Sequence, residues 1–417
     1  MINRLALKLF RRIKRELAVF KQLNRQNQLL LLCSTLYWLA NPFVSLFLNI
    51  YLWRVANSLL MVACFNLFLF LGVPFGFILN GWLLRKLSNK TALRLGLILQ
   101  GVFPLILILL GESAFRYLPL LGFINGINVS FYWGNYNLFI YDLTTDKTRG
   151  YYTGINTLLS TAAATLASPL AGLVIGVLGQ GWLQLEVSQA YYLSFILTTF
   201  IFVLAAMVVG QINTHEEALD FSLSGLLAKK SPGWNRIRLL NLTTGFYGGV
   251  FSFSLGILAF YFFGQETGVG WFNGLIGIIS ALAAYLAGRL ATPSRRILTA
   301  LVAAIPFFIG SLIFSLSWSL VTFYVFAILT GIGTTALLTV KIPLDMKEMD
   351  QGHLSETQRY KYLVDLEIFL NSGRALGILL LILLANVFSF ELAYRLTILV
   401  IGFIPFIVLK LVKNLNG

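Results

Sequence analysis

The sequence is poor in charged residues, in cysteine and in histidine. Only 11% of its 417 residues are charged, against roughly 25% in ordinary soluble domains, while 58% are hydrophobic. The two cysteines, Cys33 and Cys64, lie in apolar runs, and the two histidines, His215 and His353, lie in polar stretches. A disulfide framework and a Cys/His metal site are therefore excluded. The composition is that of an all-α polytopic membrane protein.

Common catalytic motifs are missing as well. The chain has no G-x-x-x-x-G-K-[ST] phosphate loop, no G-x-S-x-G elbow and no H-E-x-x-H pair. These absences exclude ATP hydrolysis and the familiar hydrolase reactions, so we expect the protein to have no enzymatic activity and to bind no metal or cofactor. Energy for any transport would have to come from a gradient.

Long apolar runs dominate what is present. A bilayer-spanning helix needs about 20 apolar residues, and twelve runs meet that length. We place the predicted spans at 29–52, 58–83, 91–111, 117–141, 152–178, 189–210, 239–263, 269–290, 297–317, 319–341, 362–387 and 390–411.

The basic residues behind the net charge of +15 are concentrated in the loops on one side of the predicted spans. With these spans, 27 of the 31 Lys and Arg fall in the termini and loops of one side, three fall on the other side, and Arg374 lies inside a span. The positive-inside rule then places both termini in the cytoplasm. The basic charge predicts contact with the lipid bilayer and not with nucleic acid.

Two polar segments divide the chain. Residues 1–28 alternate basic and apolar positions at helical spacing, which predicts a basic amphipathic segment at the inner leaflet or a partner-binding arm. Residues 211–238 form the widest polar interruption, a cytoplasmic linker between bundles at 29–210 and 239–417. A shift of 210 residues superposes Tyr37 on Tyr247 and Arg85 on Arg295. The chain therefore contains two parallel six-helix repeats.

This architecture and one loop resemble the major facilitator superfamily. Gly76-x-x-x-Asn80 followed by Arg85 and Lys86 is similar to that family's second–third loop signature, with Asn80 where an acid is usual and the bases one residue late. The resemblance implies a gating role, with position 80 docking on the N-terminal end of the eleventh helix and a base pairing with Asp142. The neutral Asn80 would make a weaker lock, because a hydrogen bond replaces an attraction to the helix dipole.

A narrower resemblance rests on two stretches. The residues FYWGNYNLFIYDLTTDKTRG at 131–150 and EIFLNSGR at 367–374 are similar to the YQGE-type transporters, a poorly characterised bacterial branch of this family.

Polar stripes occur on two predicted spans. Asn125, Asn128 and Tyr132 share one face of the fourth span, and Asn41 and Asn49 share one face of the first. Transporters of this architecture hold substrate between their halves at the midplane, so these residues are candidates for substrate binding. The alternative is that the amides hydrogen-bond helix to helix.

Glycine pairs such as Gly172/Gly176, Gly270/Gly274 and Gly373/Gly377 predict close backbone packing.

The eleventh predicted span carries charges. Glu367, Asn371 and Arg374 project from one face of a helix, which cannot point at lipid. Glu367 is a candidate for proton coupling or gating, and Asn371 and Arg374 are candidates for substrate binding. A buried Glu367–Arg374 pair that only fixes packing is the alternative.

Charges near the loops of the basic side predict a cytoplasmic gate. The set consists of Gly76, Asn80, Arg85, Lys86, Asp142, Arg149, Asp345 and Arg359.

The leading hypothesis is a monomeric secondary-active transporter of the bacterial inner membrane. It would move a small solute of unknown identity by alternating access between its halves, with protons as one candidate coupling ion. Two alternatives stay open, an exporter of lipids or hydrophobic compounds and a non-transporting membrane scaffold or assembly factor.

Overall fold

Helices make up nearly all of the computed structural model. It describes residues 23–144, 146–180, 186–213, 218–228, 230–290, 292–349 and 354–416, without the side chains of residues 146, 147, 149, 150, 180, 293 and 416, and no strand occurs among them. The predicted amphipathic segment 1–28 therefore lies almost wholly outside the described residues. The helices are α2 (Arg25–Ser45), α3 (Phe47–Ala56), α4 (Leu59–Leu83), α5 (Asn89–Leu110), η1 (Gly111–Tyr117), α6 (Leu118–Leu143), α7 (Asp146–Gln180), α8 (Val187–Gly210), α9 (Pro232–Phe263), α10 (Glu266–Leu290), η2 (Pro293–Arg295), α11 (Arg296–Leu316), α12 (Leu320–Met349), α13 (Glu356–Val387) and α14 (Phe390–Asn416).

Local sequence signals account for several helix ends. Ser231 accepts a hydrogen bond from the backbone N–H of Trp234 at 3.1 Å and is followed by Pro232 at the first helical position. Helix α9 therefore begins at Pro232, and the linker is shorter than the predicted 211–238. Ser355 caps α13 in the same way, with Gln358 completing a capping box.

The first span is interrupted. Pro42 has no N–H to donate to the carbonyl of Trp38, four residues earlier, and the helix breaks at Leu46. Helices α2 and α3 together make this span, Arg25–Ala56.

The helices are long and apolar enough to cross a membrane. Among the described residues eleven helical stretches meet this criterion, and one of them, Asn89–Leu143, runs through α5, η1 and α6. Counting α5 and α6 separately gives the twelve predicted spans.

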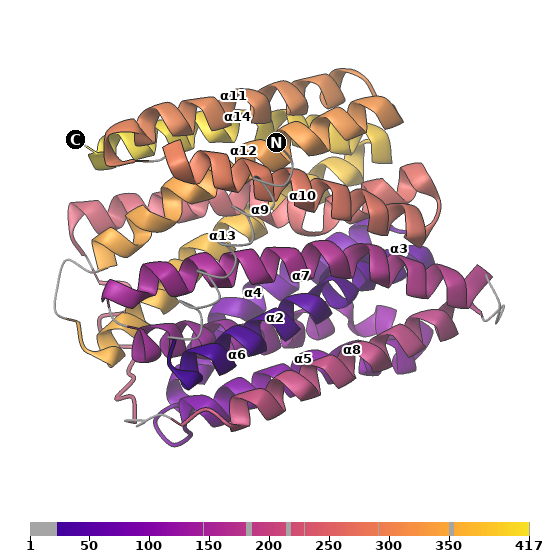
Figure 1. Cartoon of the computed structure of the whole chain (residues 1–417). Helices are drawn as coiled ribbons and strands as arrows, with labels where there is room; N and C mark the ends of the chain where they lie inside the picture. The colour runs from indigo at the N-terminus through magenta and orange to yellow at the C-terminus, as the bar shows by residue number, and fades with distance from the viewer. Residues whose placement is uncertain are drawn as a thin grey trace, which may run out of the picture.

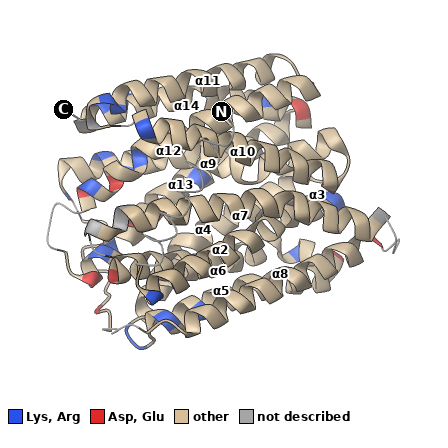
Figure 2. Ribbon diagram, in the orientation of Figure 1, with Lys and Arg blue, Asp and Glu red and all other residues tan. Residues whose placement is uncertain are grey.

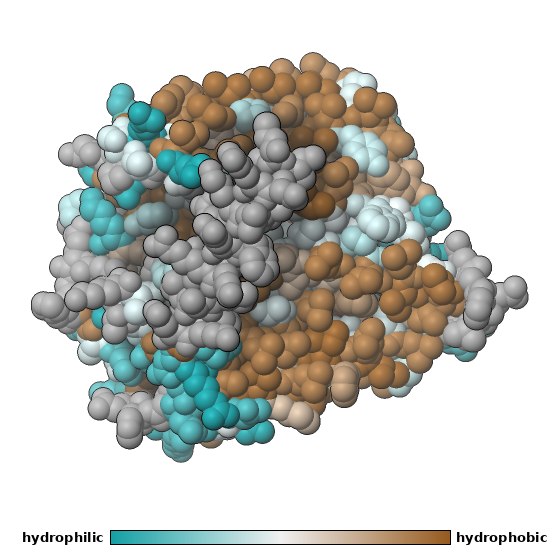
Figure 3. Space-filling view, viewed as in Figure 1, coloured by the Kyte–Doolittle hydropathy of each residue, from teal (hydrophilic) through white to brown (hydrophobic). Residues whose placement is uncertain are grey.

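The chain forms two bundles that lie side by side. Helices α2–α8 form the N-terminal half and α9–α14 the C-terminal half, and α7 runs next to α10 at the boundary (Figure 1). We call the end where α8 ends and α9 begins the terminal face, and the other end the far face. Most Lys and Arg gather at the terminal face, near the C-terminus (Figure 2). The visible flank between the two ends is mostly hydrophobic (Figure 3), as a bilayer requires.

Glycines allow unusually close packing of α13 on α9. A Cβ on Gly245 would overlap the carbonyl oxygen of Leu370, and one on Gly373 would overlap that of Leu242. Nearer the far face, Gly172 of α7 and Gly270 of α10 pack closely against each other across the two halves. Gly172, Gly270 and Gly373, each a member of a predicted glycine pair, thus make the close backbone contacts expected from the sequence.

Candidate functional site

The two halves meet at the terminal face through neutral hydrogen bonds. The amide of Asn80, fully buried on α4, donates to the phenol oxygen of Tyr360 on α13 at 2.9 Å and to Oδ1 of Asn135 on α6 at 3.1 Å. Asn135 donates back to Asn80 at 3.0 Å, and Tyr360 donates to the carbonyl of Phe77 at 2.7 Å. Asn80 therefore contacts the first turns of α13, where the loop signature predicts it, and it does so through the phenol of Tyr360.

The other predicted gate residues divide between the halves. Arg359 lies over the ring of Tyr141 in the opposite half at 5.2 Å, so it bridges them. Gly76 packs against Ile127 and Ser130 of α6 in its own half.

Asp345 bonds inside the C-terminal half. It accepts from Lys341 at 2.6 Å and from Asn241 of α9 at 3.3 Å. Arg85, Lys86 and Asp142 are exposed at the terminal face, and the side chain of Arg149 lies outside the described residues.

Glu367, Asn371 and Arg374 on the predicted face of α13 form a chain of hydrogen bonds, which we call the relay. Asn371, fully buried, donates to Oε2 of Glu367 at 2.8 Å and accepts from Nη1 of Arg374 at 3.0 Å. The Arg374 guanidinium lies over the ring of Phe70, on α4 of the opposite half, at 5.0 Å. The acid and the base are thus linked through an amide, and the relay reaches the boundary between the halves.

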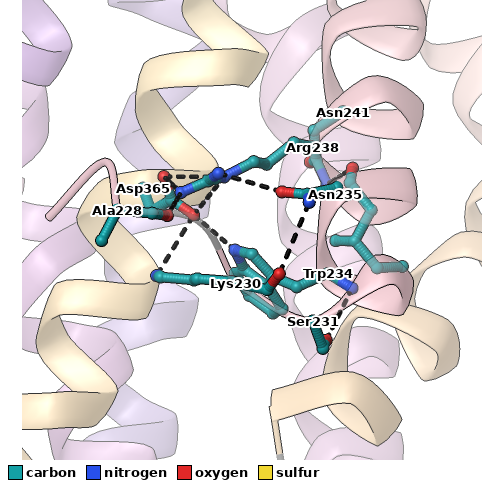
Figure 4. Close-up of polar contacts among 9 residues, drawn as sticks. Ala228, Lys230, Ser231, Trp234, Asn235, Arg238, Asn241 and Asp365 are labelled. Carbon is teal, nitrogen blue, oxygen red and sulfur yellow. Dashed lines mark hydrogen bonds and ion pairs between the residues drawn. The ribbon is translucent and has the colours of Figure 1, made fainter. Parts of the chain in front are cut away.

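A charged cluster next to this relay is absent from the sequence-based prediction (Figure 4). Asp365 of α13, fully buried, accepts three bonds of 2.9–3.1 Å from Arg238 of α9. It also accepts from Lys230 at 3.3 Å and from the indole of Trp234. We call this the Asp365 cluster.

The Asp365 cluster joins the linker to the C-terminal half. The ammonium of Lys230 lies 3.7 Å from the ring centre of Tyr362, and Arg238 also donates to the carbonyl of Ala228 at 3.2 Å. Burial lowers the pKa of Lys230, and the nearby Asp365 carboxylate opposes that shift. The cluster therefore holds α9, α13 and the end of the linker as one unit.

At the far face an ion pair joins the halves, and the sequence analysis did not assign it. Arg54, at the end of α3, donates to Oε1 of Glu266 at 2.6 Å, and the phenol of Tyr191 on α8 donates to the same oxygen at 2.9 Å. Glu266, only 4% exposed, stands in the first turn of α10, where the helix dipole favours a carboxylate. A sequence signal existed, because Arg54 is one of only three basic residues predicted for that side.

A cavity lies at the boundary between the halves, about midway along α7 and α10. It measures about 240 Å³ and is lined by α2, α7 and α10. Its walls combine Trp38 with six hydroxyl or amide side chains and carry no charge; the six are Ser160, Thr161, Thr165, Ser168, Asn273 and Ser280.

The predicted substrate-binding residues lie elsewhere in the halves. Asn49 donates to the carbonyl of Ser45 and accepts from Asn66 of α4, both at 2.7 Å, while Asn41 donates to the phenol of Tyr37 at 3.3 Å. Of these contacts, the Asn66–Asn49 bond joins two spans, as in the alternative in which the amides hydrogen-bond helix to helix, and the other two lie within the first span.

The polar stripe of the fourth span also lies inside its half. The ring of Tyr132 stacks on Tyr37 with centres 3.6 Å apart, and Asn125 and Asn128 are buried on α6. None of these residues, nor Asn371 or Arg374, lines the 240 Å³ cavity. Their binding of substrate stays a prediction.

Comparison with known proteins gives a consistent result. A sequence model of the Major Facilitator Superfamily matches residues 29–346. The "Uncharacterized protein YqgE" of Bacillus subtilis (strain 168) is 27% identical over 375 residues, which cover 89% of this chain and 86% of that protein. A Geobacillus stearothermophilus protein, "Uncharacterized protein in sodM 3'region", is 32% identical over 158 residues, 38% of this chain and 74% of its own. The resemblance to the YQGE-type branch is thereby confirmed.

Solved structures share the fold at low sequence identity. A bacterial homolog of the human lysosomal transporter Spinster, in an inward-facing unoccupied conformation, matches with a TM-score of 0.67 and 15% identity over 94% of this chain and 96% of its own. The nucleoside transporter NupG matches with a TM-score of 0.67 and 10% identity over 94% and 99%. A bacterial homologue of the iron transporter ferroportin, in an inward-facing state, matches with a TM-score of 0.66 and 16% identity over 94% and 99%.

Proposed function

The chain belongs to the major facilitator superfamily of membrane transporters, and we propose that it moves a small polar solute by alternating access between its two six-helix halves. The observation that carries this proposal is the cavity at the boundary between the halves, together with contacts that join the halves near each end. Opening of one end requires the contacts at that end to separate. Rocking of two repeats around a fixed central site is the motion that this architecture allows.

The side chains of the cavity lining support a small solute that forms hydrogen bonds. Six of its nine lining residues carry a hydroxyl or an amide. At about 240 Å³ it is smaller than the roughly 300–1,000 Å³ of pockets for drug-sized ligands. Ser168 and Asn273 donate to carbonyls of their own helices at 3.1 and 3.0 Å, which leaves acceptor oxygens for a solute that donates hydrogen bonds.

The charge distribution supports an orientation. The basic residues at the terminal face favour placement of both termini in the cytoplasm of a bacterial inner-membrane protein (Figure 2). Glu367 is the candidate proton carrier, because it is joined through Asn371 to Arg374 at the boundary of the halves. We expect the protein to work as a monomer.

Cysteine labelling of the cavity tests the proposal. In a background with Cys33 and Cys64 replaced by alanine, Thr161→Cys should react with a membrane-impermeant thiol reagent from both sides of sealed vesicles. Leu282→Cys, whose native side chain is 59% exposed on the flank within a predicted span, is the control and should stay unreactive. Absence of reaction at Thr161→Cys from both sides would contradict alternating access.

A further inference from the structure

A second hollow lies on the flank of the C-terminal half, between α10 and α11. Its volume is about 460 Å³, and its floor reaches Ile332 and Ala336 of α12. Leu286, Leu298 and Val302 line it and are each more than half exposed. These residues lie inside stretches that span the membrane. We call this hollow the α10–α11 groove; bilayer hydrocarbon is the medium that its apolar walls face.

Basic residues stand at the terminal-face end of the groove. Arg295 is part of its lining, and Arg289 and Arg296 lie on either side of Arg295 along the chain, at the end of α10 and the start of α11. Within the described part of the chain, no ion pair involves any of these three arginines. The mouth of the groove therefore carries positive charge that no described carboxylate neutralises.

The start of α11 adds a second anion-binding feature at the same place. Its N-cap residue is Arg295, whose side chain makes no cap hydrogen bond to the first turn. The N–H groups of the first turn and the positive end of the helix dipole favour an anion there, and phosphate is a common occupant of such positions.

The repeat supplies an internal comparison. Arg85 corresponds to Arg295 under the 210-residue shift, but the loop before Arg85 is covered by protein. The backbone N–H of Leu219, in the linker, donates to the carbonyl of Leu84 at 3.2 Å, and the buried Phe221 packs against Gly81. The equivalent place in the C-terminal half is the open groove.

We propose that the α10–α11 groove binds one anionic phospholipid, with an acyl chain between the helices and the phosphate at Arg295 and the N-terminus of α11. Apolar walls alone would accept the chain of any lipid. The arginine and the uncapped helix turn make the site select a negatively charged headgroup. This binding is independent of solute transport.

Native mass spectrometry of the delipidated full-length protein tests the site. We expect dioleoyl phosphatidylglycerol to bind at one tight site and dioleoyl phosphatidylcholine to bind more weakly. Arg295→Gln should weaken phosphatidylglycerol binding about fivefold, because one arginine near a membrane surface contributes roughly 1 kcal/mol to the binding of an anionic lipid. Arg85→Gln, the matched change in the covered loop of the other half, should leave it unchanged.

A second variant tests the chain position. Ala283→Phe fills the groove without changing charge and should displace phosphatidylglycerol from the tight site. Equal binding of the two lipids, or equal losses from Arg295→Gln and Arg85→Gln, would overturn the proposal in favour of non-selective surrounding lipid. Dimers that Ala283→Phe disrupts would overturn it in favour of a second copy of the chain. Arg295→Gln alone decides the matter if Ala283→Phe does not fold.

Discussion

Helix α13 is bonded differently on its two sides. Toward α9, in its own half, it makes the buried ionic contacts of the Asp365 cluster and the glycine-mediated backbone packing. Toward α4, in the other half, it makes the neutral bonds of Tyr360 and the contact of Arg374 with the Phe70 ring. Breaking a buried ion pair by removing one partner costs about 3–5 kcal/mol, whereas a neutral hydrogen bond contributes about 0.5–1.5 kcal/mol. Helix α13 should therefore move with α9 and separate from α4.

The same contrast distinguishes the two ends of the boundary. The terminal face is held by neutral hydrogen bonds and by the contact of Arg359 with the Tyr141 ring, and the far face by the Arg54–Glu266 ion pair. We therefore expect the terminal face to open more readily than the far face. The neutral Asn80, where the family signature has an acid, contributes to this asymmetry.

Removal of the central acid should have the largest effect. Asp365→Ala leaves Arg238 and Lys230 largely buried without their counter-charge, so the free energy of unfolding should fall by about 3–5 kcal/mol. Thermal unfolding in mild detergent measures the loss. Glu391→Gln breaks an exposed pair with Arg395 and should cost less than about 1 kcal/mol. Similar losses in both variants would show that the Asp365 cluster does not hold α9 and α13 together.

The far-face ion pair should control opening at that end. Glu266→Gln removes the charge that Arg54 and Tyr191 bind, so labelling of Thr161→Cys from the far face should accelerate about tenfold, equivalent to roughly 1.4 kcal/mol. Vesicles of known orientation give the rates. An unchanged far-face rate would exclude the pair as a gate.

The phenol at the terminal face should have a smaller effect. Tyr360→Phe loses the bond to the Phe77 carbonyl and the bond from Asn80, and labelling of Thr161→Cys from the terminal face should rise about fivefold, for roughly 1 kcal/mol. Tyr152→Phe is the control, because Tyr152 bonds to Tyr136 in its own half and should not change the rate. Equal rates in the two variants would count against the gate.

Restoring the acid of the family signature should have the smallest effect, and in the opposite direction. Asn80→Asp places a negative charge near the N-terminal turns of α13, which stabilises closure of the terminal face by about 0.3–1 kcal/mol. Labelling of Thr161→Cys from that face should slow about two- to fivefold. A faster rate would mean that desolvation of the new carboxylate outweighs its attraction to the helix.

Periodicity and charge placement predicted much of this arrangement. The spans follow from apolar length, and the shared face of Glu367, Asn371 and Arg374 follows from helical spacing. The docking of Asn80 followed from the loop signature. These features depend on residues close together in the chain or on a family motif.

The remaining features depend on partners far apart in the chain. Asp365 and Arg238 are 127 positions apart, and Arg54 and Glu266 are 212 apart, so no local pattern indicates either pair. Asp365 lies two residues before Glu367 and therefore on another side of α13, so the shared face of Glu367, Asn371 and Arg374 does not indicate it. Lys341 and Asp345 show the reverse case, since their spacing of four matches a helical ion pair, whereas the sequence-based prediction assigns Asp345 to the cytoplasmic gate.

Spin-label distances at the terminal face test the central claim most directly. In the background without Cys33 and Cys64, labels at exposed Glu356 and Arg236 report on α13 and α9, and labels at Glu356 and Arg85 report across the halves. For the first pair we predict one narrow distance distribution. For the second pair we predict two distances, and the population with the shorter distance should increase when Glu266 is replaced by Gln. Distances that shift together in both pairs would contradict the account, because α13 would then move independently of α9.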